Sequence, residues 1–367
     1  MDTQNRSRSE TTPDEDPVLE LRDVTVRFEM ERGESRVLDT VDLDVRRGET
    51  LGVVGESGSG KSMCASAILN AVVDPGVLTG SVRYHPSDGD PVDLLELGDD
   101  ELKRIRWNEI AFLVQAVQSA FNPTMTVRSH FIETLETHDA DLDAGMERAR
   151  ELLGEVYLDA DQVLDLHPHE LSGGMKQRAL IALSLVLEPE VLVMDEPTSA
   201  LDLLMQRSII SLLAKLKADY DLTLVFITHD LPIVSDIADR LAVMYAFEFV
   251  EVAPTETIQH EAGHPYTRAL IKSVPDVVAP VSEMQPIDGS SPDPINVPEG
   301  CSYHPRCPLA DDQCIENDPG FYEVDAEHAA KCHHWDQAAE AIPMNEGAAA
   351  TDAGERETAS DGGREGS

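Results

Sequence analysis

A glycine-rich segment between an apolar run and a helix-like stretch constrains this chain more than any other feature. Residues Leu51 to Ser62 read LGVVGESGSGKS, in which the apolar run predicts a buried strand and the residues from Lys61 onward predict a helix. The three glycines let backbone N–H groups point inward at a phosphate chain, and the helix start adds a partial positive charge. The alternative is a glycine-rich turn before an ordinary core helix, which the flanking strand and helix disfavour.

This loop supplies a set of candidate nucleotide ligands. Lys61 can reach the β- and γ-phosphates, and the Ser62 hydroxyl can ligate Mg²⁺. The residues of the loop expected to contact the nucleotide are Gly55, Glu56, Ser57, Gly58, Ser59, Gly60, Lys61 and Ser62. The loop alone therefore predicts a nucleotide-binding protein without specifying its class.

The charge of the chain narrows its possible partners. Its 367 residues carry a formal net charge of −42, from 70 acidic and 28 basic residues. This excess argues against a nucleic-acid partner, whose phosphates would repel the surface. Disorder is excluded for most of the chain, because 41% of the residues are hydrophobic and lie in periodic segments. Our hypothesis is a halophilic adaptation to a high-salt cytoplasm that screens the repulsion, and unfolding in molar KCl would contradict it.

Composition and periodicity divide the chain into four parts. Residues 1–16 and 336–367 are polar and acidic and are expected to be disordered tails. Residues 17–255 alternate continuous apolar strands with helices, which predicts an α/β fold with a parallel sheet covered on both faces. Residues 256–335 form an extension that contains a proline-rich, extended segment. We expect no signal peptide and no bilayer-spanning run, so that any membrane association is through a partner.

A second phosphate-related pattern is an apolar strand, residues 191–194, that ends in two carboxylates. Asp195 is expected to hold Mg²⁺ through water, and Glu196 is expected to act as the general base for the attacking water. An acidic pair can follow any strand, so alone it is a modest indication of a nucleotide site. Together with the glycine-rich loop it becomes a strong one.

The segment LSGGMKQR, residues 171–178, indicates which class of nucleotide-binding protein this is. Ser172, Gly173 and Gly174 at a helix start form a second anion-binding nest, which makes sense if it serves the nucleotide of another subunit. The alternative is a coincidental glycine-containing helix cap. The segment resembles the LSGGQ-like signature of the ATP-binding-cassette ATPases, with Met175 in place of the commonest glutamine.

This resemblance implies a fold and further site residues. The fold is a P-loop NTPase with a parallel sheet core, an antiparallel β subdomain and a helical signature subdomain, followed here by a Cys-rich extension. The implied roles are sensing of Mg²⁺ and γ-phosphate by Gln115, a dimer-crossing loop at Asp202, and γ-phosphate contact by His229. Phe28 stands where the family places an aromatic that stacks on adenine, although Phe28 can equally be a core residue.

The resemblance narrows to the oligopeptide/dipeptide permease branch of importers over residues 18–335. It is carried by four segments: GESGSGKS, Pro168–Glu170, Gly263–Leu270 and Pro298–Pro308. Two departures affect it. The family usually follows its sensing glutamine with Asp-Pro, whereas Ala-Val follows here, and Phe247 replaces a usual turn glycine after Met244-Tyr245-Ala246.

The branch implies a complex. The chain is expected to be an ATPase that pairs with a second ATPase subunit and two membrane permease subunits, with an extracellular solute-binding protein acting indirectly. It would lie at the cytoplasmic face of the cell membrane as a peripheral protein. The same branch also imports nickel, oligosaccharides and other solutes, and a soluble cassette ATPase of translation or DNA repair is a rival of another class.

Four cysteines follow one another in the extension: Cys301, Cys307, Cys314 and Cys332. Four thiolates can hold Zn²⁺ or a [4Fe–4S] cluster, and free thiols are the third possibility. Some ATPases of the branch carry an iron–sulfur cluster on this extension, so the resemblance implies a [4Fe–4S] cluster here. His304, His333 and His334 lie near these cysteines and are expected at the surface.

Overall fold

The computed structural model describes residues 17–113, 120–199, 201–273, 287 and 289–344. The predicted N-terminal tail, Gln115 and most of the predicted C-terminal tail lie outside these residues. The prediction of disorder from residue 336 is wrong at its start, because α13 (Ala338–Ala341) forms there with Ala338 fully buried. Arg268 holds this end of the chain by donating to the Ile342 carbonyl at 3.2 Å.

An eight-stranded mixed sheet forms the centre of the molecule, in the order β11-β12-β10-β9-β3-β8-β7-β6. Five of its strands are parallel: β3 (Thr50–Val54), β6 (Ile110–Leu113), β7 (Val191–Asp195), β8 (Thr223–Thr228) and β9 (Arg240–Tyr245). Three antiparallel strands extend it: β10 (Glu248–Pro254), β11 (Tyr322–Asp325) and β12 (His328–Ala330). The parallel strands are almost wholly buried, as their continuous apolar sequences predict.

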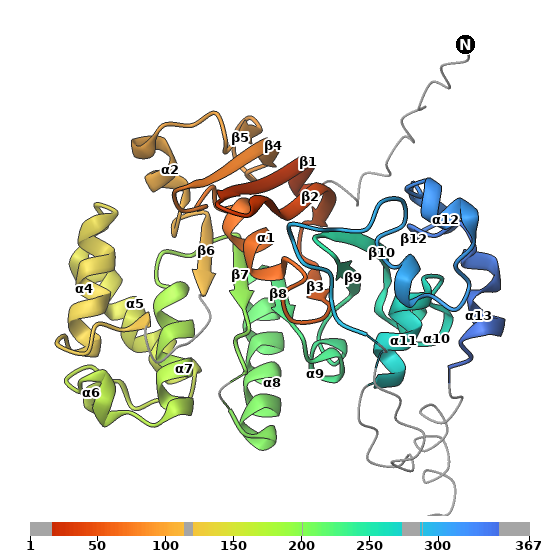
Figure 1. Ribbon diagram of the computed structural model, residues 1–367. Helices are drawn as coiled ribbons and strands as arrows, with labels where there is room; N and C mark the ends of the chain where they lie inside the picture. The colour runs from red at the N-terminus through yellow and green to blue at the C-terminus, as the bar shows by residue number, and fades with distance from the viewer. Residues whose placement is uncertain (1–16, 114–119, 200, 274–286, 288, 345–367) are drawn as a thin grey trace, which may run out of the picture.

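A four-stranded antiparallel sheet packs above one face of this central sheet (Figure 1). Its strands are β1 (Pro17–Met30), β2 (Gly33–Arg46), β4 (Gly76–Tyr84) and β5 (Val92–Asp93). Helix α1 (Lys61–Ile68) contacts both sheets, and its apolar side chains belong to the hydrophobic core between them. The short helix α2 (Asp99–Ile105) follows β5.

The other face of the central sheet is covered by helices. Two of them pack on this face: α8 (Leu203–Tyr220), which follows β7 in the chain, and α9 (Leu231–Ser235), which follows β8. A separate helical group follows β6 and consists of α4 (Val127–Thr137), α5 (Leu142–Glu155), α6 (Ala160–Val163), η1 (Pro168–Glu170) and α7 (Gly173–Ser184). Parallel core, antiparallel sheet and helical group are thus all present, as predicted from the sequence.

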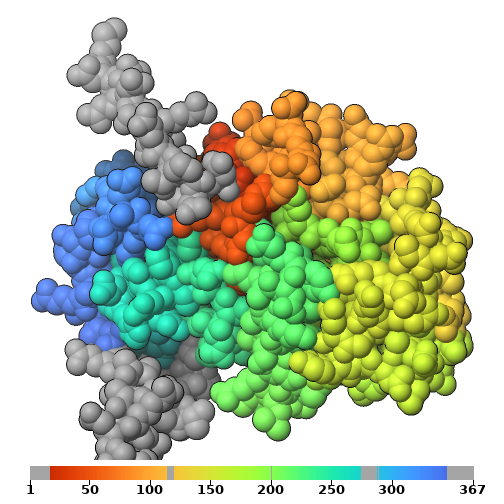
Figure 2. All heavy atoms as spheres, turned by 180° about the vertical axis from the view of Figure 1, so that it is seen from behind, coloured from red at the N-terminus to blue at the C-terminus, as the bar shows by residue number. Residues whose placement is uncertain are grey.

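The C-terminal part of the chain folds against the opposite end of the central sheet. It contains α10 (Thr255–Glu261), α11 (Pro265–Ser273), η3 (His304–Arg306), α12 (Asp312–Glu316), η4 (Trp335–Gln337) and α13. Figure 2 shows this part and the helical group at opposite ends of the molecule.

The turn between β9 and β10 explains how the chain tolerates Phe247. Ala246 and Phe247 have φ values of 47° and 75°, the left-handed region that a two-residue hairpin turn requires and glycine favours. Phe247 is buried, its N–H donates to the Ser59 carbonyl at 3.0 Å, and its carbonyl accepts from Asp39. Burial and these bonds hold the aromatic residue in a backbone conformation that costs it energy.

A buried histidine makes stability depend on pH. His264 is 1% exposed, and its Nδ1 accepts the Tyr266 N–H at 3.0 Å. Burial lowers the pKa of His264 to about 4, although the negative charge of Glu251 opposes this shift. The charge of Lys331 also lowers the pKa, whereas a hydrogen bond to the Lys331 backbone opposes the lowering. A histidine in the unfolded chain has a pKa near 6.5. Between about pH 6.5 and 4 the histidine is therefore protonated in the unfolded state but still neutral in the folded state.

We therefore expect the free energy of unfolding to fall by up to about 3 kcal/mol as the pH drops through that window. Urea denaturation of the wild type and His264→Asn at several pH values measures this dependence. The variant should lose most of the slope between pH 6.5 and 4. Equal slopes in the two proteins would show that other groups cause the acid sensitivity.

Candidate nucleotide-binding and hydrolysis site

The phosphate loop, residues 55–62, joins β3 to α1 and can be built only with glycine at two of its positions. Gly60 precedes α1 with a φ of 105°, and a Cβ there would lie 2.6 Å from the Val37 carbonyl oxygen. A Cβ on Gly55 would lie 2.1 Å from the Met244 carbonyl oxygen. Backbone packs on both sides of the loop, while Ser57 and Gly58 stay exposed.

Lys61 is the first residue of α1, and its ammonium group lies inside the loop. Its Nζ donates to the carbonyl oxygens of Gly55 and Glu56, each at 2.8 Å. Burial lowers the pKa of Lys61, and the carboxylates of Glu196 and Asp195 oppose this shift. The lysine charge is thus held by the loop beside the two acidic residues.

Asp195 ends β7 and offers an oxygen without a partner. Its side chain is buried, and among the described residues no hydrogen-bond partner contacts its Oδ1. Burial raises the pKa of Asp195, which a hydrogen bond from Ser62 counteracts. An unpartnered buried carboxylate oxygen next to a hydroxyl is a donor set that suits Mg²⁺.

Glu196 follows β7 with a φ of 50°, and the end of β8 holds its carboxylate. Its Oε1 lies 2.7 Å from His229 Nδ1 and accepts the His229 backbone N–H at 3.1 Å. The Thr228 hydroxyl donates to Oε2 at 3.4 Å. The structure thus brings together two residues that the sequence separates by more than thirty positions. Thr228 is a contact that the sequence patterns did not single out.

The signature residues begin α7, and α8 packs against them. Ser172 caps the helix, since its Oγ accepts from the Met175 N–H at 3.2 Å. A Cβ on Gly174 would lie 2.2 Å from Met205 Cε, whereas a Cβ on Gly173 would meet open space. Asp202 in turn caps α8 through its bond from the Met205 N–H at 3.0 Å. The two predicted interface loops are therefore packed together.

Within one chain the helix that begins with the signature residues, α7, lies away from the phosphate loop. Figure 1 places α7 in the helical group, apart from α1 and the loop that precedes it. Ser172, Gly173, Asp202 and His229 are all exposed. The arrangement leaves them accessible to a second molecule.

Two further predicted residues are less informative. Phe28, on β1, is half-buried against the core between the sheets, and its Cζ lies 2.7 Å from the place of a Cβ on Gly76. Adenine stacking by Phe28 stays a prediction. Gln115 lies outside the described residues, so its sensing role also stays a prediction.

Sequence reasoning missed the residues that hold Glu56 of the phosphate loop. Arg306 contacts both of its carboxylate oxygens, at 2.8 and 3.0 Å. The Ser291 hydroxyl donates to Oε2, and the Glu56 N–H donates to the Tyr266 hydroxyl at 2.9 Å. Arg306 lies in the segment Pro298–Pro308 that carried the resemblance, but no sequence pattern connects it to a residue 250 positions earlier.

The four late cysteines lie in the C-terminal part, and none of them forms a disulfide in the described chain. The Cys301 N–H donates to the Cys314 carbonyl at 2.8 Å. Burial raises the pKa of Cys332 to about 12, and the charges of the other three thiols reinforce the shift. The thiols are thus close enough to influence one another.

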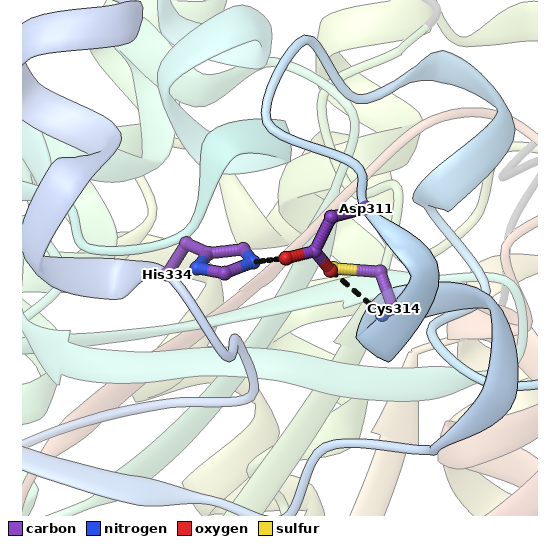
Figure 3. A group of neighbouring side chains, drawn as sticks. All are labelled: Asp311, Cys314 and His334. Atoms are coloured by element: carbon purple, nitrogen blue, oxygen red, sulfur yellow. Dashed lines mark hydrogen bonds and ion pairs between the residues drawn. The ribbon is translucent and has the colours of Figure 1, made fainter.

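One group near these cysteines includes a histidine that was expected at the surface. Figure 3 shows Asp311 between Cys314 and His334. The Asp311 carboxylate accepts the Cys314 N–H at 3.1 Å and lies 3.0 Å from His334 Nε2. His334, like His304 and His333, is partly exposed, and each of the three contacts a neighbouring polar group.

Comparison with known families and proteins shows the family of this chain. Residues 38–199 match the family described as ABC transporter, and residues 250–314 match the oligopeptide/dipeptide transporter C-terminal region. The dipeptide transport ATP-binding protein DppD of Caldanaerobacter subterraneus subsp. tengcongensis is 40% identical over 87% of this chain and 98% of its own. The oligopeptide transport ATP-binding protein AppD of Bacillus subtilis is 34% identical over 87% of this chain and 97% of its own.

Solved structures give the same result for the cassette. The dimeric structure of MJ0796, a bacterial ABC transporter cassette, has a TM-score of 0.56 and 28% identity over 65% of this chain and 98% of that chain. A post-hydrolysis dimer of MJ0796 bound to ADP and phosphate matches equally well. The chain therefore belongs to the ABC transporter ATPases, in the branch of dipeptide and oligopeptide transport ATP-binding proteins.

Proposed function

We propose that this protein is the ATP-hydrolysing subunit of a complex that imports dipeptides and oligopeptides. One observation carries the proposal: a residue of the oligopeptide/dipeptide transporter C-terminal region, Arg306, contacts the phosphate loop directly. The nucleotide site and the transporter-type region thus act as one folded unit. We assign residues 17–255 to the ATP-binding domain and residues 256–335 to the extension.

In the hydrolytic step, Glu196 accepts the proton of the attacking water as general base. The contacts from Thr228 and His229 fix the direction of its carboxylate, and this orientation matters as much as basicity. His229 is exposed and can contact the γ-phosphate of the same site. Lys61 supplies positive charge to the β- and γ-phosphates when ATP displaces the loop carbonyls from its ammonium group.

The residues present also suit a magnesium ion. Ser62 and Asp195 would hold it, because the Asp195 Oδ1 has no hydrogen-bond partner in the described part of the chain. Mg²⁺ would neutralise charge on the phosphates. Gln115 is the further ligand we propose. Phe28 is proposed to stack on the adenine.

A complete site requires a second ATPase subunit, identical or related. Each ATP lies between the phosphate loop of one subunit and Ser172, Gly173 and Gly174 of the other, with Asp202 at the interface. The exposure of Ser172 and Gly173 at a helix start supports this, because unpaired N–H groups there bind anions. The dimeric cassette structures of MJ0796 give the same support.

The pair would bind two membrane permease subunits, to which an extracellular solute-binding protein delivers the peptide. None of the helices within the described ranges is long and apolar enough to cross a bilayer. We place the subunit on the cytoplasmic face of the membrane, as a peripheral protein held by the permease. ATP-driven closure of the pair would move the permease subunits.

Uptake assays test the proposal. Cells that lack this chain should lose ATP-dependent uptake of labelled dipeptide and oligopeptide, and a wild-type copy should restore it. Purification of the tagged chain should retain permease subunits. Loss of nickel or oligosaccharide uptake with normal peptide uptake would assign another cargo, and co-purification with ribosomes would indicate a soluble function.

We further propose that Cys301, Cys307, Cys314 and Cys332 hold a [4Fe–4S] cluster. Tetrahedral zinc with bonds of about 2.3 Å would require thiolate sulfurs only about 3.8 Å apart. In the described chain, however, the only group of three or more metal-ligating side chains within 4.8 Å of one another is Asp311, Cys314 and His334. No three of the cysteine sulfurs lie that close together in the described chain, so as placed they do not form a tetrahedral zinc site, and a [4Fe–4S] cluster is the other group that four thiolates can hold.

The cluster can be detected without an activity assay. We expect anaerobically purified protein to contain about four iron atoms per chain and to show a broad charge-transfer absorption that bleaches with dithionite. Cys332→Ser should abolish both signals, and Cys64→Ser, a fully buried thiol of α1, serves as the matched control. Stoichiometric zinc without iron would instead support a site at Asp311, Cys314 and His334.

A further inference from the structure

The ion pair between the phosphate loop and the extension is largely shielded from solvent. The Arg306 side chain is 6% exposed and that of Glu56 is 24% exposed. Two guanidinium nitrogens contact the two carboxylate oxygens, the bidentate geometry that gives such pairs their strength and direction. Removal of Glu56 would leave the buried Arg306 guanidinium without its carboxylate partner.

Side chains of β9 and of the C-terminal part surround this contact. The rings of Tyr245 and Tyr303 flank the guanidinium at 5.6 and 5.8 Å from their centroids. Tyr266 accepts the Glu56 N–H, and Ser291 donates to its carboxylate. These contacts therefore hold both the backbone and the side chain of Glu56 in place.

Glu56 in turn determines the position of the lysine that binds phosphate. Its carbonyl oxygen accepts from Lys61 Nζ at 2.8 Å, and the Ser59 N–H donates to the same carbonyl at 3.2 Å. A shift of Glu56 would consequently displace the loop backbone and the lysine together.

Arg306 itself is positioned by the loop between two cysteines. The short helix η3 contains it, the His304 N–H donates to the Cys301 carbonyl, and the Cys307 N–H donates to the His304 carbonyl. The conformation of the Cys301–Cys307 loop thereby sets where the guanidinium lies.

We propose that Arg306 is a positioning residue for ATP binding, through which the Cys301–Cys307 loop holds the phosphate loop in its nucleotide-binding shape. This inference rests on the proposed ATPase function. Arg306 acts through Glu56 and does not touch the nucleotide in this assignment. Its loss should therefore weaken ATP binding while leaving the chemical step largely intact.

ATPase kinetics and equilibrium binding of a fluorescent ATP analogue test this in the full-length protein. Arg306→Gln should raise KM and the dissociation constant by ~10-fold or more, with kcat at saturating ATP within about twofold of wild type. Arg306→Lys should restore part of the affinity, because it keeps the charge but loses the bidentate contact. Arg128→Gln, which removes a surface pair with Asp165 on the helical group, is the matched control.

A double-mutant cycle separates the outcomes. Glu56→Gln should have the same effect as Arg306→Gln, and the double variant should be no worse than either single variant. Additive effects, or an unchanged KM in a folded Arg306→Gln protein, would overturn the inference. If Arg306→Gln does not fold, Glu56→Gln with Arg306 intact decides the question by the same readout. Wild-type protein without ATPase activity would instead contradict the proposed function.

Discussion

Glu196→Gln is expected to lower the turnover number for ATP by about 10²- to 10⁴-fold, because it removes the general base. Glutamine has nearly the same shape, and its single carbonyl oxygen can still accept the His229 N–H, while its amide NH2 can donate to the Thr228 hydroxyl instead of accepting from it. The phosphate loop, Lys61 and Asp195 are untouched, so we expect the ATP dissociation constant to change by no more than a few-fold. Single-turnover hydrolysis and equilibrium ATP binding measure the two quantities separately.

The control for this prediction is Glu133→Gln, which changes an exposed carboxylate of α4. It should leave both turnover and affinity unchanged. Turnover of Glu196→Gln at the wild-type rate would remove Glu196 from its assigned role. Equal losses of binding and turnover would indicate that the variant has disturbed the loop rather than the chemical step.

Lys61→Met is expected to weaken ATP binding by about 10- to 100-fold, because it removes charge-assisted hydrogen bonds worth roughly 1.5–3 kcal/mol to the phosphates. Methionine keeps most of the length of the side chain and suits its buried stem. The lysine also bridges the carbonyls of Gly55 and Glu56, so the empty loop should become less rigid. Isothermal titration with ATP measures the affinity.

Lys103→Met on α2 is the matched control, since Lys103 is exposed and belongs to no part of the site. It should bind ATP like the wild type. Unchanged affinity of Lys61→Met would show that this lysine does not contact the phosphates. Amide hydrogen exchange across residues 55–60 would then report whether its role is confined to the empty loop.

The parts of the site that depend on short sequence segments could be predicted. The glycine-rich loop, the acid pair after β7 and the capped start of α7 each lie within about eight residues, so residue type and spacing define them locally. The parallel strands could be predicted for the same reason, since continuous apolar runs of five or six residues are typical of strands buried on both faces.

Contacts between distant segments could not be predicted. Glu56 and Arg306 form an ion pair, but the sequence contains very many acidic and basic residues that could pair. Nothing in their spacing indicates that these two do. The same holds for Glu251, which is fully buried and lies 2.7 Å from Nε2 of His328. Polar residues of this kind are predicted at the surface from their type alone, and the tertiary fold places them inside only because each finds a specific partner.

Phe247 departs from the glycine that the family usually has at this turn, but the conformation of the turn could not be predicted from this replacement. Substitution of a usual glycine suggests a different turn, yet the backbone keeps the left-handed conformation at both central positions. The bond from the Phe247 N–H to the Ser59 carbonyl explains this, since a different turn would lose a contact to the phosphate loop. Tertiary contacts outweigh local preference here.

The pairing of β12 with β10 has a consequence for how the chain can be shortened. β12 is part of the extension, and its Ala329 and Ala330 align with Val252 and Glu251. A chain truncated after β10 would expose an apolar, unpaired strand with free N–H and C=O groups, which invites edge-to-edge association between molecules. The extension thus also acts as a cover against self-assembly, and excision of the cassette alone would yield an aggregating fragment.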